Sequence, residues 1–386
     1  MEKLIDALTR YKCTLSAKDR AIFREIFSLD NQQAILRLHP FIWGSSATAY
    51  YSSIVDQRFT LFKLPRIDQV LVQYDKEKLL KTIDQFPLDL SLNPDDDDGV
   101  IESREDLYDP RFILLSIYHL LSPHNLINCS KFINLRGLSI VLVCTSSNQP
   151  SIRSLAYAVL NRFYSHLESA KASSLVYLWT HFVNCFRSTL KTENQKNPYL
   201  LTVTLVLSIE VINSPKSPLF PYVKDFVGQK ASFENSCLAK FFLSLLRSND
   251  LSWKMFQSTA LNILAKSVFD EGDFKICTEF DLYKIIFSLY TSEWTDKSAK
   301  LAILKFIKRC VSIHSVLEKL IVEDAIIPWL TLIVVNGSNF TEPTIQELEQ
   351  ISKIIRKSRK HLRVEDEMIT HSIKILYNCV KKLRTE

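Results

Sequence analysis

Residues 151–168 read SIRSLAYAVLNRFYSHLE, and this stretch decides the fold class. Its apolar side chains recur in steps of three and four residues, at Ile152, Leu155, Ala156, Val159, Leu160, Phe163 and Leu167. That spacing places them on one stripe of an α-helix, with polar residues on the other side. Pro150 directly precedes the stretch, where a proline suits the first turn of a helix. The pattern predicts an amphipathic helix that packs one face against a core.

The same rhythm returns along the second half of the chain, in residues 238–246, 256–269, 282–290, 299–311, 345–355 and 368–380. Start and stop signals separate these stretches, at residues 197–198, 213–218, 248–250, 271–273 and 336–338. Helical pairs then recur about every forty residues, which is the size of HEAT and armadillo units. No consensus letters repeat with that period. The sequence predicts an all-α, armadillo/HEAT-like helical repeat (an α-solenoid), with a non-repeating helical domain as the alternative.

Glycine is scarce, with 6 residues in 386, whereas about 7% is usual. Nucleotide-cradling loops and tight hairpins need backbone with positive φ, which glycine adopts at little cost. The chain also lacks the G-x-x-x-x-G-K-[ST], G-x-G-x-x-G, G-x-S-x-G and H-E-x-x-H motifs. These features predict a protein that is not an enzyme and has no cofactor, metal or small-molecule substrate.

The first third is less regular, with helices expected at residues 2–11, 17–27 and 77–85 and loops at 43–46 and 61–65. Residues 93–106 are acidic and poor in apolar groups, so that self-repulsion predicts an exposed loop or linker. The consecutive carboxylates of Asp95 to Asp98 lack the alternate spacing of an EF-hand, which favours a solvated loop over a calcium site. The predicted division is 1–92, an irregular helical N-terminal segment; 93–106, the acidic loop or linker; 107–340, a helical-repeat domain; and 341–386, basic C-terminal helices.

The 8 cysteines are isolated from one another, and most stand in apolar runs. A thiol in such a run behaves as a small hydrophobe. The pattern predicts core thiols in a reducing compartment such as the cytosol or nucleus, with zinc and disulfide sites as the alternatives. The chain opens without a signal-peptide pattern, and its longest apolar stretches are shorter than the roughly 20 residues of a membrane span. We therefore expect a soluble protein without a membrane partner.

Charge is unevenly distributed: residues 1–109 carry 14 basic and 19 acidic side chains, and the remainder carries 34 and 23. The densest basic stretch, residues 353–363, reads KIIRKSRKHLR. On a helix, five cations of this stretch share one stripe, named here the basic ridge: Lys353, Arg356, Lys357, Lys360 and Arg363. Four apolar side chains turn the other way, towards the core: Ile351, Ile354, Ile355 and Leu362. Such a ridge can neutralise RNA phosphates. It is a candidate RNA- or partner-binding site, with a solvated helix face or a nuclear-import signal as alternatives.

Several blocks resemble a known family in their order and spacing. They are LLKTIDQFP at 79–87, LYDPRFILL at 107–115, CSKF at 129–132, GL at 137–138, IRSLAYAVL at 152–160 and FYSHLE at 163–168. Together these resemble the C-terminal domain of the nucleolar pre-ribosomal-associated protein 1 family, and a weaker similarity covers roughly residues 41–335. Asp109 suits the N-cap and Pro110 the first position of a helix. Arg153, Ala156 and Tyr157 are expected on the face where one repeat meets the next.

The resemblance implies a scaffold of early large-subunit assembly in the nucleus and nucleolus. It implies a helical-repeat fold, other pre-ribosomal assembly factors as partners and support of rRNA processing, with pre-rRNA as a further candidate partner. It also implies that family members are far longer, with a large helical region ahead of this one. The alternative function is a helical-repeat protein–protein adaptor outside ribosome biogenesis, whose basic ridge would meet acidic protein surfaces.

Overall fold

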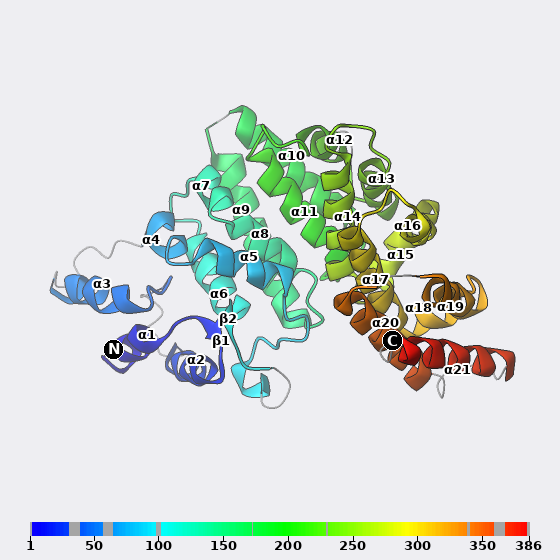
Figure 1. Ribbon diagram of the computed structural model, residues 1–386. Coiled ribbons are helices and arrows are strands. Elements are labelled where there is room, and N and C mark those ends of the chain that lie inside the picture. Colours follow the sequence, from blue (N-terminus) through cyan, green and yellow to red (C-terminus); the bar gives the residue numbers. More distant parts are fainter. Residues whose placement is uncertain are drawn as a thin grey trace. The chain divides into compact units, whose positions relative to one another are not determined.

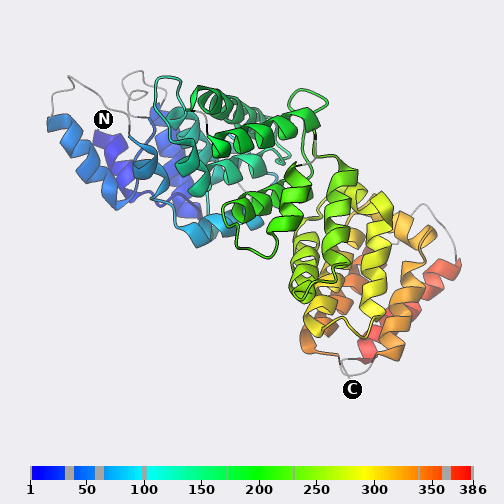
Figure 2. The ribbon, with the colours of Figure 1, turned by 90° about the horizontal axis from the view of Figure 1, so that it is seen from above.

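The computed structural model describes residues 2–30, 39–56, 65–97, 102–171, 173–228, 231–337, 340–358 and 367–383. Helix accounts for 72% of the structure and strand for 2%, which confirms the all-α class. The chain forms two compact units (Figure 1; Figure 2). Unit 1 comprises Met1–Asn197, Leu205–Ser214 and Lys230–Ser232, and unit 2 comprises Pro198–Thr204, Pro215–Gln229 and Phe233–Glu386. None of the helices in the described ranges is long and apolar enough to cross a bilayer.

Unit 1 begins with α1 (Glu2–Arg10), β1 (Thr14–Leu15), α2 (Ala17–Asp30), α3 (Ser45–Asp56), α4 (Ile67–Leu71), α5 (Lys76–Asp84), the 3-10 turn η2 (Pro94–Asp97) and β2 (Arg104–Tyr108). It continues with α6 (Pro110–Leu120), α7 (Cys129–Asn134), α8 (Gly137–Cys144), α9 (Pro150–Ser169) and α10 (Ser174–Thr189). The predicted helices at 2–11, 17–27, 77–85 and 151–168 are confirmed as α1, α2, α5 and α9. Helix α3 was not predicted, because its serines and threonines are weak helix formers, and it is supported by packing on α1.

Helix α9 buries the predicted stripe. Six of its seven stripe residues are buried, and Leu155 is half-buried. Helix α8 lies against α9 and is buried on every side, as expected for a helix that is apolar all round. At Gly137, a Cβ atom would stand 2.3 Å from the Phe132 ring. That ring lies 4.8 Å from the Phe163 ring, so the missing side chain admits an aromatic contact between α7 and α9.

Arg153 joins α9 to two loops of unit 1. Its Nη1 atom donates to the carbonyls of Ser147 at 2.9 Å and Asn148 at 3.0 Å, and its Nε donates to the carbonyl of Asn194 at 3.0 Å. These bonds tie the turn before α9 to the segment after α10. Arg153 therefore lies on a face where α9 meets neighbouring segments, as the family motif indicated.

Tyr157, one helical turn further on, holds the same segment. Its hydroxyl donates to the carbonyl of Gln195 at 2.6 Å and accepts from Nδ2 of Asn197 at 2.8 Å. The Asn197 amide also donates to the hydroxyl of Thr145 at 3.1 Å. Asn197 is fully buried, so these two bonds satisfy its side-chain N–H groups, which would otherwise be costly to bury.

We expect Arg153→Ala to lower the free energy of unfolding by about 2 kcal/mol, because three charge-assisted hydrogen bonds to backbone carbonyls are lost. Urea denaturation followed by circular dichroism measures this change. Ser154→Ala is the matched control, since Ser154 is exposed on the same helix. Equal losses for the two variants would contradict the assigned role of Arg153.

The acidic stretch 93–106 ends in a strand rather than a loop. Residues of β2 pair antiparallel with β1, with Thr14 opposite Tyr108 and Leu15 opposite Arg104. Leu107 is buried with Leu15, and this apolar contact outweighs the self-repulsion that predicted a loop. The first part of the stretch forms η2, while residues 98–101 lie outside the described residues. The four-part domain division stays a prediction.

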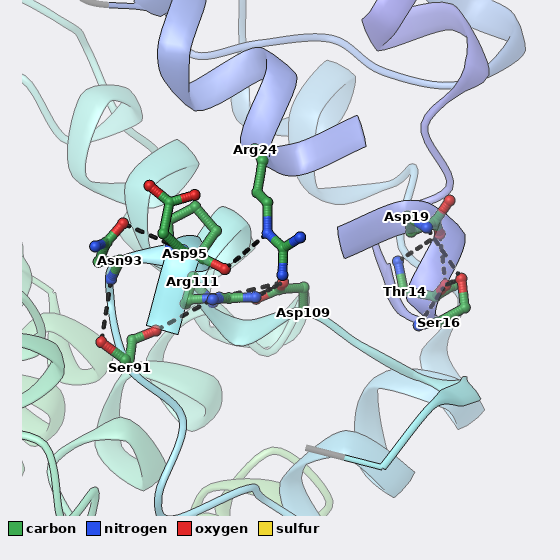
Figure 3. Close-up of polar contacts among 10 residues, drawn as sticks. Thr14, Ser16, Asp19, Arg24, Ser91, Asn93, Asp95, Asp109 and Arg111 are labelled. Carbon is green, nitrogen blue, oxygen red and sulfur yellow. Dashed lines mark hydrogen bonds and ion pairs between the residues drawn. The ribbon is translucent and has the colours of Figure 1, made fainter. Parts of the chain in front are cut away.

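The predicted helix start at Asp109 and Pro110 is confirmed, and it contains a buried ion pair (Figure 3). Asp109 caps α6 by accepting the backbone N–H of Arg111 at 3.0 Å. Its carboxylate also accepts from Nη2 of Arg111 at 2.7 Å, and both side chains are 0% exposed. Nη1 of Arg111 donates to the carbonyl of Ser91 at 3.2 Å, and the guanidinium carbon lies 5.1 Å from the centre of the Phe23 ring. The motif thus links α6 to α2 and to the segment before η2.

Unit 2 contains α12 (Phe220–Gly228), α13 (Asn235–Leu246), α14 (Trp253–Ser267), α15 (Glu271–Thr278), the 3-10 turn η3 (Glu279–Asp281), α16 (Leu282–Thr291), α17 (Lys297–Ser312), α18 (His314–Val322), α19 (Ile326–Asn336), α20 (Glu342–Ser358) and α21 (Glu367–Lys382). Helix α11 (Tyr199–Ile212) contributes its first residues to unit 2 and the rest to unit 1. In unit 2, α14 packs on α17, α17 on α20, and α20 on α21. All six helices predicted in this half are confirmed.

The predicted break at 271–273 is wrong by a few residues. Glu271 and Asp273 lie in the first turn of α15, and the break falls at residues 268–270. Asp270 is the N-cap and accepts the backbone N–H of Asp273 at 3.0 Å. The acidic residues of this start or stop signal are therefore first-turn residues, where the helix dipole favours negative charge.

All eight cysteines are free thiols. Six are buried, which confirms the prediction of core thiols for Cys13, Cys129, Cys144, Cys185, Cys277 and Cys310. Cys237 and Cys379 are half-buried. Burial raises the pKa of the Cys144 and Cys310 thiols well above the ordinary value, so that both stay neutral and unreactive.

Candidate nucleic-acid interface

Helix α20 carries the first three residues of the basic ridge, and they are exposed. Its apolar residues Leu348, Ile351 and Ile355 are buried, and the helix packs on α17 and α21. Ile354 is half-buried, while Leu362 lies outside the described residues. An ion pair of 2.6 Å between Nζ of Lys308 on α17 and Glu347 also fixes α20. Packing on one side therefore leaves the opposite side of α20 open.

Three of the five ridge residues are described, and all three are exposed: Lys353, Arg356 and Lys357. Lys360 and Arg363 lie outside the described residues. The Nζ atom of Lys353 lies 3.3 Å from the Glu349 carboxylate one turn earlier, and the Lys353 side chain is 55% exposed. An exposed pair of this kind costs little to break, so Lys353 remains able to meet a phosphate or carboxylate of a partner.

The structure adds an aromatic residue that the sequence pattern did not indicate. Tyr377 of α21 lies beside the ridge, with the guanidinium carbon of Arg356 4.4 Å from its ring centre. Together with Lys353 and Lys357, these residues line an open depression of about 420 Å³. Exposed Lys374 and Lys381 fall on the same face of α21 as Tyr377, at helical spacing. The helical spacing of Lys374, Tyr377 and Lys381 is the feature of the sequence from which Tyr377 could have been predicted.

This combination of groups suits single-stranded nucleic acid. Amines and guanidinium groups neutralise phosphates, and an aromatic ring or an arginine plane supports stacked bases without sequence preference. The described part of the chain has no group of three His, Cys, Asp or Glu side chains arranged to hold a metal ion.

One buried carboxyl group, that of Asp273, also has a pKa well above its ordinary value. Burial, with a contribution from nearby Asp270, raises the pKa of Asp273 to about 7, although backbone amides of Leu200, Phe269 and Asp270 act in the opposite direction. Perturbed carboxyls often mark active sites. Asp273, however, is 0% exposed and accepts hydrogen bonds from all three amides. Its geometry is that of a structural cap at the start of α11 and α15.

Comparisons of the sequence with known proteins match one family. The family model NopRA1, described as nucleolar pre-ribosomal-associated protein 1, matches residues 138–329, a range that excludes the basic ridge. The Homo sapiens protein of that name is 24% identical over 334 residues, which is 84% of this chain and 14% of the relative. The Mus musculus protein of the same name is 25% identical over 338 residues, or 84% of this chain and 15% of the relative.

The chain thus spans about one seventh of the length of these curated relatives. No solved structure matches it significantly. The matches agree with the resemblance carried by the blocks between residues 79 and 168. The chain belongs to the nucleolar pre-ribosomal-associated protein 1 family.

Proposed function

We propose that this chain is a non-enzymatic scaffold in nucleolar pre-ribosomal particles, where it supports large-subunit assembly and rRNA processing. The observation that carries the proposal is the exposed cationic surface of Lys353, Arg356 and Lys357 beside Tyr377. Family membership supports it, because the curated relatives are named for their nucleolar and pre-ribosomal association. The partners are pre-rRNA and other assembly factors, and the location is the nucleolus.

An armadillo- or HEAT-like architecture belongs to this proposal. In unit 2, each of α14, α17, α20 and α21 packs on the next. Successive packing of this kind supports a stack of helices that grows in one direction, as in helical-repeat proteins. An extended stack would present long surfaces to several partners at once.

A second candidate function is an adaptor outside ribosome biogenesis. The pairing of Lys353 with the Glu349 carboxylate supports this candidate, because a carboxylate of a partner can take the place of a phosphate beside the ridge. An acidic protein surface would then take the place of RNA. Crosslinking the tagged protein in cells, followed by sequencing of bound RNA, separates the two functions. Enrichment of large-subunit precursor rRNA supports the scaffold, whereas background recovery together with cytoplasmic staining contradicts it.

Charge reversal of the ridge gives a direct prediction in vitro. The triple variant K353E/R356E/K357E will bind a labelled single-stranded oligouridylate about tenfold or more weakly, because phosphate contacts are lost. The slope of log affinity against log salt will also flatten, by about 0.7 for each lost contact. Fluorescence anisotropy across a salt series measures both quantities.

The matched control for this experiment is K224E/K240E/K305E, which makes the same change in net charge at exposed lysines of other helices. It will leave the salt slope close to that of the wild type. If both triple variants weaken RNA binding equally, the affinity depends on the net charge of the whole chain. The ridge is then a solvated helix face. Circular dichroism of each variant confirms that the fold is retained.

A further inference from the structure

A groove of about 440 Å³ lies in unit 2 among α16, α17, α19 and the start of α20. Its volume falls in the range of about 300–1,000 Å³ that is typical of ligand-binding clefts. Aromatic side chains of three segments line it: Tyr290, Trp329 and Phe340. The Trp329 ring lies 5.4 Å from the Phe287 ring in a stacked arrangement and 5.9 Å from Tyr290 in an edge contact. These contacts hold Trp329 in place, so the groove has a rigid aromatic floor.

The aliphatic side of the groove is open to solvent. Leu332 lines it and is 57% exposed, and Val335 nearby on the same helix is 64% exposed. An aromatic floor next to exposed aliphatic groups forms an apolar surface without a partner in the described chain. Apolar surfaces of this kind, bordered by polar residues, mark protein-interaction sites.

Gly337 shapes one wall of the groove. A Cβ atom at this position would stand 2.0 Å from Cζ of Phe340 and 2.7 Å from the carbonyl oxygen of Ile333. The Phe340 ring therefore lies directly over the glycine, at the point where α19 ends. The Gly337 backbone has a φ of −77°, so the backbone conformation itself does not require glycine. The close approach of the Phe340 ring and of the Ile333 carbonyl oxygen does.

The charge of the groove selects the kind of partner. Lys297 and Lys300, from the first turns of α17, line it, and no residue among those that line it is acidic. The carboxylate of Asp296, which precedes them, caps α17 by accepting the backbone N–H of Ala299 at 2.7 Å. A groove with two amines and an apolar floor is complementary to a segment that carries carboxylates on either side of a large apolar side chain.

We propose that this groove binds an acidic protein segment through one apolar anchor residue. The anchor packs on Trp329 and Leu332, and the flanking carboxylates pair with Lys297 and Lys300. A protein segment is favoured over RNA because exposed Leu332 beside the Trp329 floor offers an apolar contact that suits an aliphatic or aromatic side chain. The groove shares no residue with the basic ridge, so peptide binding to the groove and RNA binding to the ridge can be tested independently.

The probe is a synthetic, fluorescein-labelled peptide of aspartates and glutamates around a central Phe-Leu pair, titrated with the full chain in a polarisation assay. Two control peptides replace the acidic residues with glutamine or the Phe-Leu pair with serine. Both controls will bind about tenfold more weakly than the probe. Equal binding of all three peptides would overturn the proposal.

Variants locate the binding on the chain. K297E/K300E will weaken peptide binding about tenfold, and L332E will weaken it by at least as much, because a charge replaces an exposed apolar contact. K305E is the matched control, since Lys305 is exposed on α17 and does not line the groove. It will change the affinity by less than about twofold.

Gly337→Ala adds a test of shape without a change of charge. The new methyl group displaces the Phe340 ring, and peptide affinity falls while the salt dependence of binding stays the same. Ser288→Ala, an exposed change on α16 away from the groove residues, leaves the affinity unchanged. Loss of peptide binding in K297E/K300E together with full binding in both L332E and G337A would mean that charge attraction alone holds the peptide. That result would overturn the proposed binding of an apolar anchor in the groove. Tighter binding of oligouridylate than of peptide, abolished by L332E, would assign the groove to RNA instead.

Discussion

Replacing Asp109 with alanine will lower the free energy of unfolding by about 3–5 kcal/mol, because the buried Arg111 guanidinium loses the carboxylate with which it pairs. Both side chains of this pair are 0% exposed, and their closest atoms are 2.7 Å apart. The variant also loses the N-cap of α6, since the Asp109 carboxylate accepts the Arg111 backbone N–H. Arg111 also contacts the Ser91 carbonyl and the Phe23 ring, and neither group carries a negative charge.

Two further variants separate the ion pair from the cap. Arg111→Met keeps the cap and buries an unpaired carboxylate, so we expect a loss comparable to that of Asp109→Ala. The double variant D109S/R111M keeps a capping hydroxyl and removes both charges. Apolar replacement of a whole buried pair is often close to neutral, so the double variant will be more stable than R111M alone.

Equilibrium urea denaturation measures these losses, and hydrogen exchange of the α6 amides shows whether the effect is local. Lys319→Ala is the control, because its pair with Glu323 spans 3.9 Å and is partly exposed. That change will cost less than about 1 kcal/mol. If D109S/R111M is as unstable as the sum of the two single variants, the two side chains are not energetically coupled.

The local helices of this protein could be predicted because their signals lie within one stretch of chain. The stripe of α9 and the cap at Asp109 and Pro110 are examples, and both are confirmed. The burial of Arg111 could not be predicted in the same way. An arginine in the first turn of a helix usually points to solvent. The partners of Arg111, Ser91 and Phe23, come from segments far away in the sequence.

The candidate site was predictable to a similar extent. Helical spacing placed Lys353, Arg356 and Lys357 on one exposed face, and the structure agrees for all three. Tyr377 was missed because periodicity within α20 carries no information about which helix lies beside it. The groove was missed for the same reason, since most of its lining residues come from four helices, α16, α17, α19 and α20, and meet only through the packing of those helices.

Replacing Asp273 is expected to cause the second large loss of stability. Its carboxylate accepts the backbone N–H groups of Leu200 at 2.9 Å, Phe269 at 3.0 Å and Asp270 at 3.4 Å. Asp273→Ala removes the acceptor of these three hydrogen bonds, of which the bond from Leu200 is buried and the other two are part-buried. We expect a loss of about 3–5 kcal/mol, because each lost acceptor of a buried or part-buried donor costs roughly 1–3 kcal/mol. Urea denaturation at constant pH measures the loss. The control Asp296→Ala removes an exposed N-cap in α17 and will cost only about 1 kcal/mol.

The pH dependence of the Asp273→Asn variant tests the ionisation of this group. Burial raises the pKa of Asp273 in the folded chain to about 7, from an ordinary value of 3.8. Between these values the folded chain holds a proton that the unfolded chain has released, so the stability from this group falls as the pH rises, by up to about 1.4 kcal/mol per pH unit. Asparagine does not titrate. The stability of the wild type relative to Asp273→Asn will therefore decrease from about pH 4 to pH 7 and stay level above that. An opposite trend would mean that the three amide donors outweigh burial and hold the carboxyl ionised.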